Sequence, residues 1–115
     1  MKVNFNKSFK DYKGEEVLIE KEVLKDGKKV IEKHPQMISE MVCRCLFSGE
    51  TLERTGDVSK DNANKLTAHN LCMRIFAAKG AIEIVTEEAT LIKQSVSSLN
   101  AGGYAQIVNL IEGGK

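Results

Sequence analysis

The sequence contains no tryptophan, only one proline and six aromatic residues among its 115 positions. A hydrophobic core must therefore be built mainly from Ile, Val, Leu, Met and Ala side chains. No stretch approaches the roughly eighteen apolar residues that cross a bilayer as a helix, and the first residues lack the apolar run of a signal peptide. We expect a cytoplasmic protein with no membrane partner.

A strong excess of one charge is also absent, because 17 Lys and Arg residues oppose 16 Asp and Glu residues. This balance disfavours general nucleic-acid binding. Three cysteines, an odd number, without an export signal indicate reduced thiols. The 42% hydrophobic and 29% charged residues are typical of a folded protein. We predict one domain over 1–115, with a β-hairpin region at 1–34 and a mainly helical region at 35–112.

The N-terminal region shows the patterns of β structure. Apolar and polar residues alternate over 2–9, which predicts a half-buried strand. Further on, Asp26 and Gly27 form a dipeptide that accommodates the positive φ angles of a type I′ turn. We therefore predict an antiparallel hairpin that pairs 16–25 with 28–34.

A helix is predicted after Pro35, which ends the strand because proline cannot donate to a ladder. Apolar residues recur at helical spacing from Met37 to Leu46. Gly49 suits the left-handed backbone conformation that ends a helix. Residues 50–58 have weak periodicity and predict an exposed loop.

A second helix is predicted to start near Ser59 or Asp61 and to run to Lys79, with Gly80 closing it. The side chains expected to face the core are Leu66, Cys72 or Met73, and Phe76.

The C-terminal part predicts a short strand over 81–85 and two more helices. Thr86 precedes two glutamates, which predicts a helix start with a hydroxyl cap and acids near the positive end of the dipole. The order of elements, β-β-β-α-α-β-α-α, favours an α+β fold. In this fold an N-terminal antiparallel hairpin or meander packs on a C-terminal bundle of about four helices.

Two segments are candidates for phosphate binding. Gly102 and Gly103 stand before the last predicted helix, where exposed N–H groups and the helix dipole attract anions, and Tyr104 follows them. Arg54 and Thr55 lie in the predicted loop, where a guanidinium group suits phosphate. Neither segment matches a P-loop or a dinucleotide fingerprint, so ordinary turns are the alternative interpretation.

A metal site is a weaker hypothesis. His69 and Cys72 are three residues apart on a predicted helix and can present two zinc ligands from one face. Cys45 or Cys43, and His34, would have to complete the site, and the spacing matches no familiar ligand pattern. Buried thiols and a surface histidine are the ordinary interpretation. We expect no metal, no cofactor and no catalytic residue.

Five segments cover most of the chain: KVNFNKSFKDYKGEEV, ISEMVCRCLF, LTAHNLCMRIF, IEIVTEEATLIKQSV and YAQIVNLIEG. In pattern and order the chain resembles a group of small, mostly uncharacterised accessory proteins of tailed bacteriophages and prophages. Members of this group are usually shorter between the opening strand and the first helix. The long hairpin departs from their pattern and is a candidate for the specific function.

The resemblance implies a non-catalytic accessory role in the cytoplasm of a bacterial host. One form is a counter-defence protein that sequesters a host signalling nucleotide, such as a cyclic nucleotide, or inhibits a defence effector. The alternative is a structural or assembly factor, or a chaperone, whose hairpin pairs with a host or phage protein by strand addition. The sparsely aromatic core and the exposed hairpin edge also predict a homo-oligomer.

Overall fold

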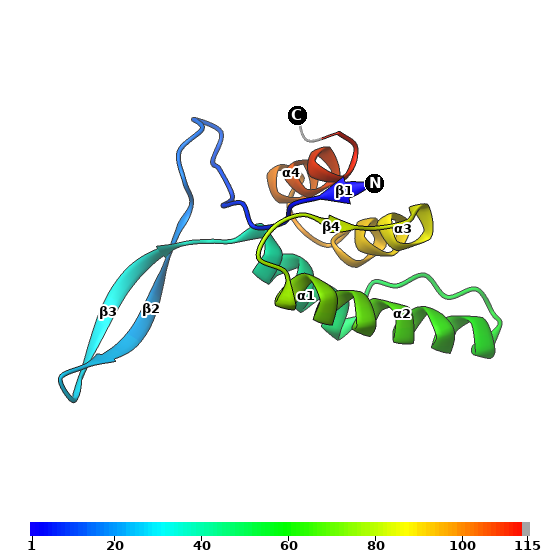
Figure 1. The fold of residues 1–115 in the computed structure, drawn as a ribbon, viewed down its shortest axis with the longest axis horizontal. Coiled ribbons are helices and arrows are strands. Elements are labelled where there is room, and N and C mark those ends of the chain that lie inside the picture. Colours follow the sequence, from blue (N-terminus) through cyan, green and yellow to red (C-terminus); the bar gives the residue numbers. More distant parts are fainter. Residues whose placement is uncertain (114–115) are drawn as a thin grey trace.

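The computed structural model describes residues 1–113, and its elements follow the expected order (Figure 1). Within these residues, four helices form the body of the molecule: α1 (Ile38–Ser48), α2 (Val58–Ala77), α3 (Thr86–Ser95) and α4 (Ala101–Ile111). The short strands β1 (Lys2–Val3) and β4 (Ile82–Glu83) pair antiparallel, and β2 (Leu18–Lys25) pairs with β3 (Lys28–Pro35). The predicted α+β class is confirmed.

The β2–β3 hairpin forms an arm that extends away from the helices (Figure 1). With this arm the molecule spans 52 Å in its longest dimension and 25 Å in its shortest. Lys25 pairs with Lys28 across the tip. Asp26 and Gly27 have φ angles of 53° and 75°, the positive values that a type I′ turn requires. The predicted hairpin and its turn are confirmed.

The N-terminal segment holds the base of the arm. The Val17 N–H donates to the Phe9 carbonyl at 2.9 Å, and the Phe9 N–H donates to the Gln36 carbonyl at 2.8 Å. The Gln36 N–H in turn donates to the Val17 carbonyl at 2.8 Å. Of the strand predicted over 2–9, regular structure is therefore restricted to Lys2–Val3, because the chain then turns to make this junction.

The core lies between the helices and the N-terminal segment. Val3, Phe5 and Phe9 are buried there, as their alternation predicts. The helices contribute mainly aliphatic side chains: Ile38, Val42, Leu46, Ala68, Leu71, Cys72, Ile75, Leu91, Ile92, Ile107 and Ile111. Val96, directly after α3, is buried with them. The core is therefore mainly aliphatic, as the composition predicts.

Helix α2 turns a different face to the core than the sequence predicts. The side chains expected inside were Leu66, Cys72 or Met73, and Phe76. Cys72 is buried, but the exposed fractions of Leu66, Met73 and Phe76 are 63%, 43% and 80%. The buried side of the helix consists of Ala68, Leu71, Cys72 and Ile75. Because α2 is apolar on two sides, its pattern does not determine which side packs inward. The helix also ends at Ala77, before Gly80.

The helix ends combine one confirmed and one corrected prediction. Gly49 has a φ of 63° and ends α1 in the left-handed conformation, as predicted. Thr86, in contrast, is the first residue of α3 and not its cap. The Glu88 carboxylate accepts the Val85 N–H at 3.0 Å and thereby satisfies one of the donors at the start of this helix.

Candidate functional site

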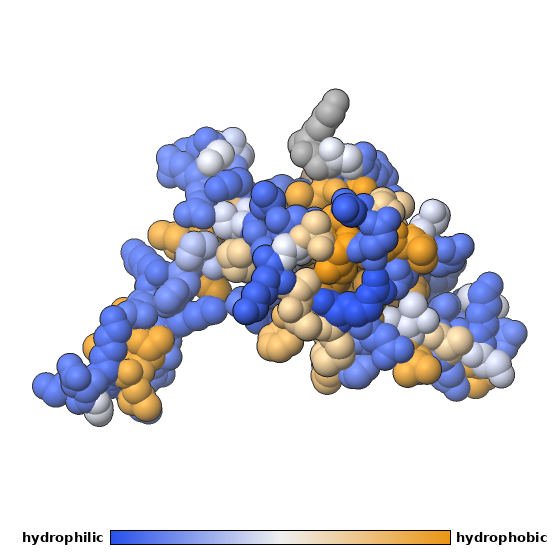
Figure 2. All heavy atoms as spheres, in the orientation of Figure 1, coloured by the Kyte–Doolittle hydropathy of each residue, from blue (hydrophilic) through white to orange (hydrophobic). Residues whose placement is uncertain are grey.

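The arm presents apolar side chains on both of its faces. Leu18, Leu24 and Ile31 lie on one face, with exposed fractions of 52%, 72% and 69%. Val23 and Val30 are paired on the opposite face. In the part of the chain that the structure describes, no helix covers the outer part of the arm, and Figure 2 shows its apolar atoms open to solvent.

The arm also has two unpaired edges. Within residues 1–113, β2 and β3 pair only with each other, so each strand leaves one row of backbone groups without a strand partner. Ion pairs join the two strands, between Lys25 and Glu32 and between Lys29 and Glu22. The hydrogen bond from Lys25 is the main reason that the pKa of Glu32 lies below its usual value. Such exposed pairs contribute little stability.

The glycines predicted to bind phosphate lie inside α4. Gly102 and Gly103 belong to its first turn, not to a segment before it, and they line a cavity of about 440 Å³ beside the base of the arm. The Asn100 side chain accepts the Gly103 N–H at 2.8 Å. Tyr104 is half-buried against the core. The Gly103 N–H, which the sequence suggested as a donor to an anion, is therefore already bonded to the helix cap.

Arg54 lines a different cavity, of about 510 Å³, together with Glu53 and Asp61. Thr55 donates its hydroxyl, at 2.7 Å, and its N–H, at 3.0 Å, to the Asp61 carboxylate. These bonds, the hydroxyl first, lower the pKa of Asp61. A carboxylate thus occupies the donors expected to meet phosphate, and the structure does not bring Arg54 and Thr55 together with the α4 glycines.

The structure also does not bring together the residues predicted to bind a metal ion. Among residues 1–113 no group of three or more His, Cys, Asp or Glu residues is arranged to hold a metal ion. Cys72 faces Cys43 and not Cys45: each of the two facing thiols donates to the other residue's carbonyl, Cys72 at 3.3 Å and Cys43 at 3.5 Å. The exposed His69 ring lies 6.0 Å from the Phe47 ring.

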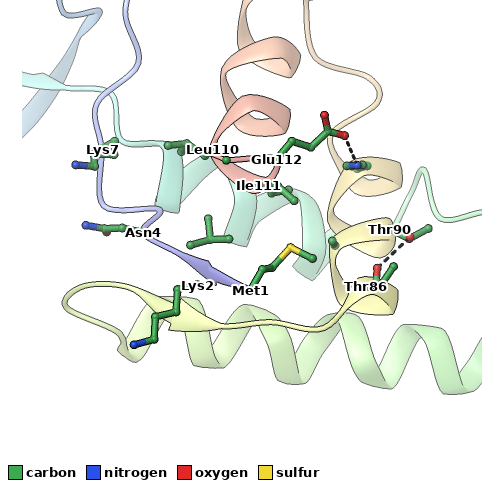
Figure 3. Close-up of a pocket in the computed structure, with 13 residues that line it drawn as sticks. Met1, Lys2, Asn4, Lys7, Thr86, Thr90, Leu110, Ile111 and Glu112 are labelled. Carbon is green, nitrogen blue, oxygen red and sulfur yellow. Dashed lines mark hydrogen bonds and ion pairs between the residues drawn. The ribbon is translucent and has the colours of Figure 1, made fainter. Parts of the chain in front are cut away.

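A cavity of about 700 Å³ lies among the N-terminus, α3 and α4 (Figure 3). The side chains of Met1 and Ile111 border its interior, while Lys2 extends away from Ile111. Lys93 donates to the Glu112 carboxylate at 2.7 Å. Because these polar groups are turned away or paired with each other, the cavity does not specify the chemistry of a ligand.

An exposed apolar surface on α2 was not predicted. It includes Leu66 and Phe76, which were expected in the core, and Met73, which was the alternative to Cys72 there. Val58, from the predicted loop, is 73% exposed and also belongs to it. Figure 2 shows apolar atoms recurring along the lower edge of the molecule, over α2. The signal that identifies this surface is the two-sided apolar pattern of 58–77.

Comparisons with known proteins find no match: no family model, no curated protein and no solved structure is significantly similar to the chain. Of the helices described in residues 1–113, none has the length and apolar character needed to cross a bilayer.

Proposed function

We propose that the chain is a non-catalytic accessory protein of a tailed phage or prophage, and that it binds a protein partner in the host cytoplasm by β-strand addition to its arm. The observation that carries this proposal is the arm itself, with two unpaired edges and apolar side chains on both faces. An added strand makes main-chain hydrogen bonds along one edge, and the neighbouring side chains provide specificity.

A third strand would also stabilise the arm. A two-stranded hairpin by itself is marginally stable in water. Leu24 and Ile31 are 72% and 69% exposed, so an added strand can cover apolar surface that the described chain leaves open. These features support a structural, assembly or chaperone role. We also propose a homo-oligomeric state, because a face of α2 is left uncovered as well.

The geometry gives less support to nucleotide sequestration, because Asp61 occupies the donors of Thr55 and Asn100 occupies the Gly103 amide. A protein that sequesters a cyclic nucleotide gains thermal stability when the nucleotide is added. We expect no such shift in Tm. A rise of several degrees with one nucleotide, lost in Arg54→Ala or Gly103→Val, would instead favour the counter-defence function.

The hydrogen-bond alternation of antiparallel strands identifies the outward-facing amides of the arm. Lys25 and Lys28 flank the two-residue type I′ turn, so these opposite residues form a hydrogen-bonded pair. Pairs alternate along the ladder, which directs the N–H groups of Glu22 and Ile31 toward the outer edges. Proline at either position removes an outward N–H and leaves the β2–β3 ladder in place.

The test is co-purification of the tagged protein from infected host cells, followed by binding measurements with the purified partner. Glu22→Pro or Ile31→Pro, on whichever edge the partner occupies, should weaken binding roughly fivefold or more, equivalent to one lost hydrogen bond. Glu22→Thr is the matched control for Glu22→Pro. It also removes the ion pair with Lys29 but keeps the N–H, so it should bind like the wild type. Unchanged binding in both proline variants would contradict strand addition.

A further inference from the structure

One side of α2 is exposed and carries no formal charge over the full length of the helix. Opposite the buried side, six exposed residues recur at spacings of four and three and form what we term the outer face: Ser59, Ala63, Leu66, Asn70, Met73 and Ala77. The charged residues of the helix, Lys60, Asp61, Lys65 and Arg74, lie outside these six positions. A surface helix normally places its charges opposite the core, so this pattern is that of a helix covered on both sides.

Large apolar side chains widen the outer face on the side of α1. Val58 and Phe76 are 73% and 80% exposed, and Phe47 of α1 is 68% exposed. The Phe47 ring lies beside His69 of α2, which makes the surface continuous between the two helices. Contiguous exposed apolar surface of this kind marks an interaction site.

We propose that two copies of the chain form an antiparallel dimer through the outer face of α2. The spacings between its six residues are 4, 3, 4, 3 and 4, which read the same in both directions. A two-fold axis that crosses the outer face midway between Leu66 and Asn70 therefore places Met73 of one copy opposite Ala63 of the other. It also places Ala77 opposite Ser59. Leu66 then faces Asn70 beside the axis. The Met73 side chain has a small residue opposite it, and closely packed helices require such complementarity.

The charge pattern favours a second copy over a charged partner. Self-pairing brings no like charges together at the centre of the interface, because the outer face has none. Beside it, Lys60 of one copy approaches Arg74 of the other, whose charge is compensated by the ion pair with Glu88. Asn70 lies near the axis, and a polar residue at the centre of an apolar helix seam fixes the register at some cost in stability.

The size of the face sets the expected strength of the dimer. A helix of 20 residues is about 30 Å long and about 10 Å wide. A pair of such helices is small compared with standard interfaces, which bury about 800 Å² on each partner. The dimer should therefore dissociate on dilution. This inference does not depend on strand addition to the arm.

Sedimentation equilibrium of the full chain over a range of concentrations tests the proposal. The wild type should shift from monomer to dimer as its concentration rises. Leu66→Glu should raise the dissociation constant by more than about tenfold, because it buries a carboxylate without a partner. Leu24→Glu on the arm is the matched control, since the two leucines are 63% and 72% exposed, and it should dimerise like the wild type. Circular dichroism checks that both variants are folded.

Two outcomes would overturn the proposal. One is a wild type that stays monomeric at every concentration. The other is a dimer that Leu66→Glu leaves intact. If Leu24→Glu alone abolishes the dimer, the arm and not α2 is the contact. Glu22→Pro should keep the dimer even where it weakens partner binding, so failure of one proposal is distinguishable from failure of the other.

A charge pair tests the antiparallel register. Ala63→Lys and Met73→Glu should each weaken the dimer. The double variant places the new lysine of one copy opposite the new glutamate of the other, twice across the axis, and should recover dimer at concentrations where both single variants are monomeric. A parallel pair would place each change opposite itself. Failure of the double variant to recover would therefore overturn the register.

Discussion

Cys43 and Cys72 face each other where α1 packs against α2, and each thiol donates to the other residue's backbone carbonyl. Burial, together with the neighbouring Cys72, raises the pKa of Cys43 to about 12, and burial also raises the pKa of Cys45. The thiolate is the reactive form of cysteine. The Cys43 and Cys45 thiols are therefore poorly suited to nucleophilic attack at neutral pH.

We predict that Cys43 reacts slowly with iodoacetamide in the folded protein. The pKa rises from 9.0 to about 12, so at pH 8 the thiolate fraction falls by a factor of up to about a thousand. Alkylation should be at least about a hundredfold slower than in the urea-unfolded chain, and faster at each higher pH up to about 12. Peptide mapping by mass spectrometry measures both rates. Equal rates in the two states would show that the thiol is not held as described.

Single residues also show which site features the sequence can reveal. Gly49 was predicted correctly because its left-handed backbone is a local requirement of a helix end. Arg54 and Thr55 were named for their chemistry, but their surroundings depend on tertiary contacts. The Thr55 donors meet Asp61, and the Gly103 amide meets its cap residue. A sequence pattern names donors, whereas the fold decides what they bind.

At the scale of elements, the two strands of the arm were predictable and the orientation of α2 was not. The arm follows from strand patterns around Asp26-Gly27, where nearly all the information is local. Helix α2 carries apolar residues at helical spacing on two sides, with Leu71 on one and Leu66 on the other. Contacts with α1 and α3 bury the side that carries Leu71. The sequence of α2 alone therefore does not determine which of its two apolar sides faces the core.

Two leucine truncations in α2 test this orientation. Leu71 is fully buried, so Leu71→Ala should lower the free energy of unfolding by about 2–5 kcal/mol. Leu66→Ala should change it by less than about 0.5 kcal/mol, because the side chain is exposed in the monomer. Urea denaturation at low protein concentration, where dimers dissociate, measures both values. Comparable losses for the two variants would place Leu66 in the core after all.

At the scale of the whole molecule, the arm and the helical body meet mainly at the junction of Phe9, Val17 and Gln36. Farther out, Lys21 reaches Glu40 of α1 in an exposed ion pair of 3.5 Å. Exposed pairs of this kind contribute little stability. The body should therefore fold without the outer part of the arm.

Deletion of 20–25 and 28–33 tests this independence, since it joins Ile19 through Asp26-Gly27 to His34. The shortening removes the same number of residues from both strands and keeps their faces and hydrogen-bonding pattern. We expect the Tm followed by circular dichroism to change by only a few degrees, while partner binding is lost. Loss of the cooperative helical transition would show that the arm is part of the folding unit.

The three-way junction at the base of the arm has an evolutionary consequence. It fixes where the chain leaves and rejoins the body, so the length beyond it is free to vary. Adding two residues to each strand moves the tip outward by about 7 Å and keeps every side chain on its original face. Reach and specificity can thus diverge among descendants by paired insertions, while selection for a stable core acts on a separate set of positions.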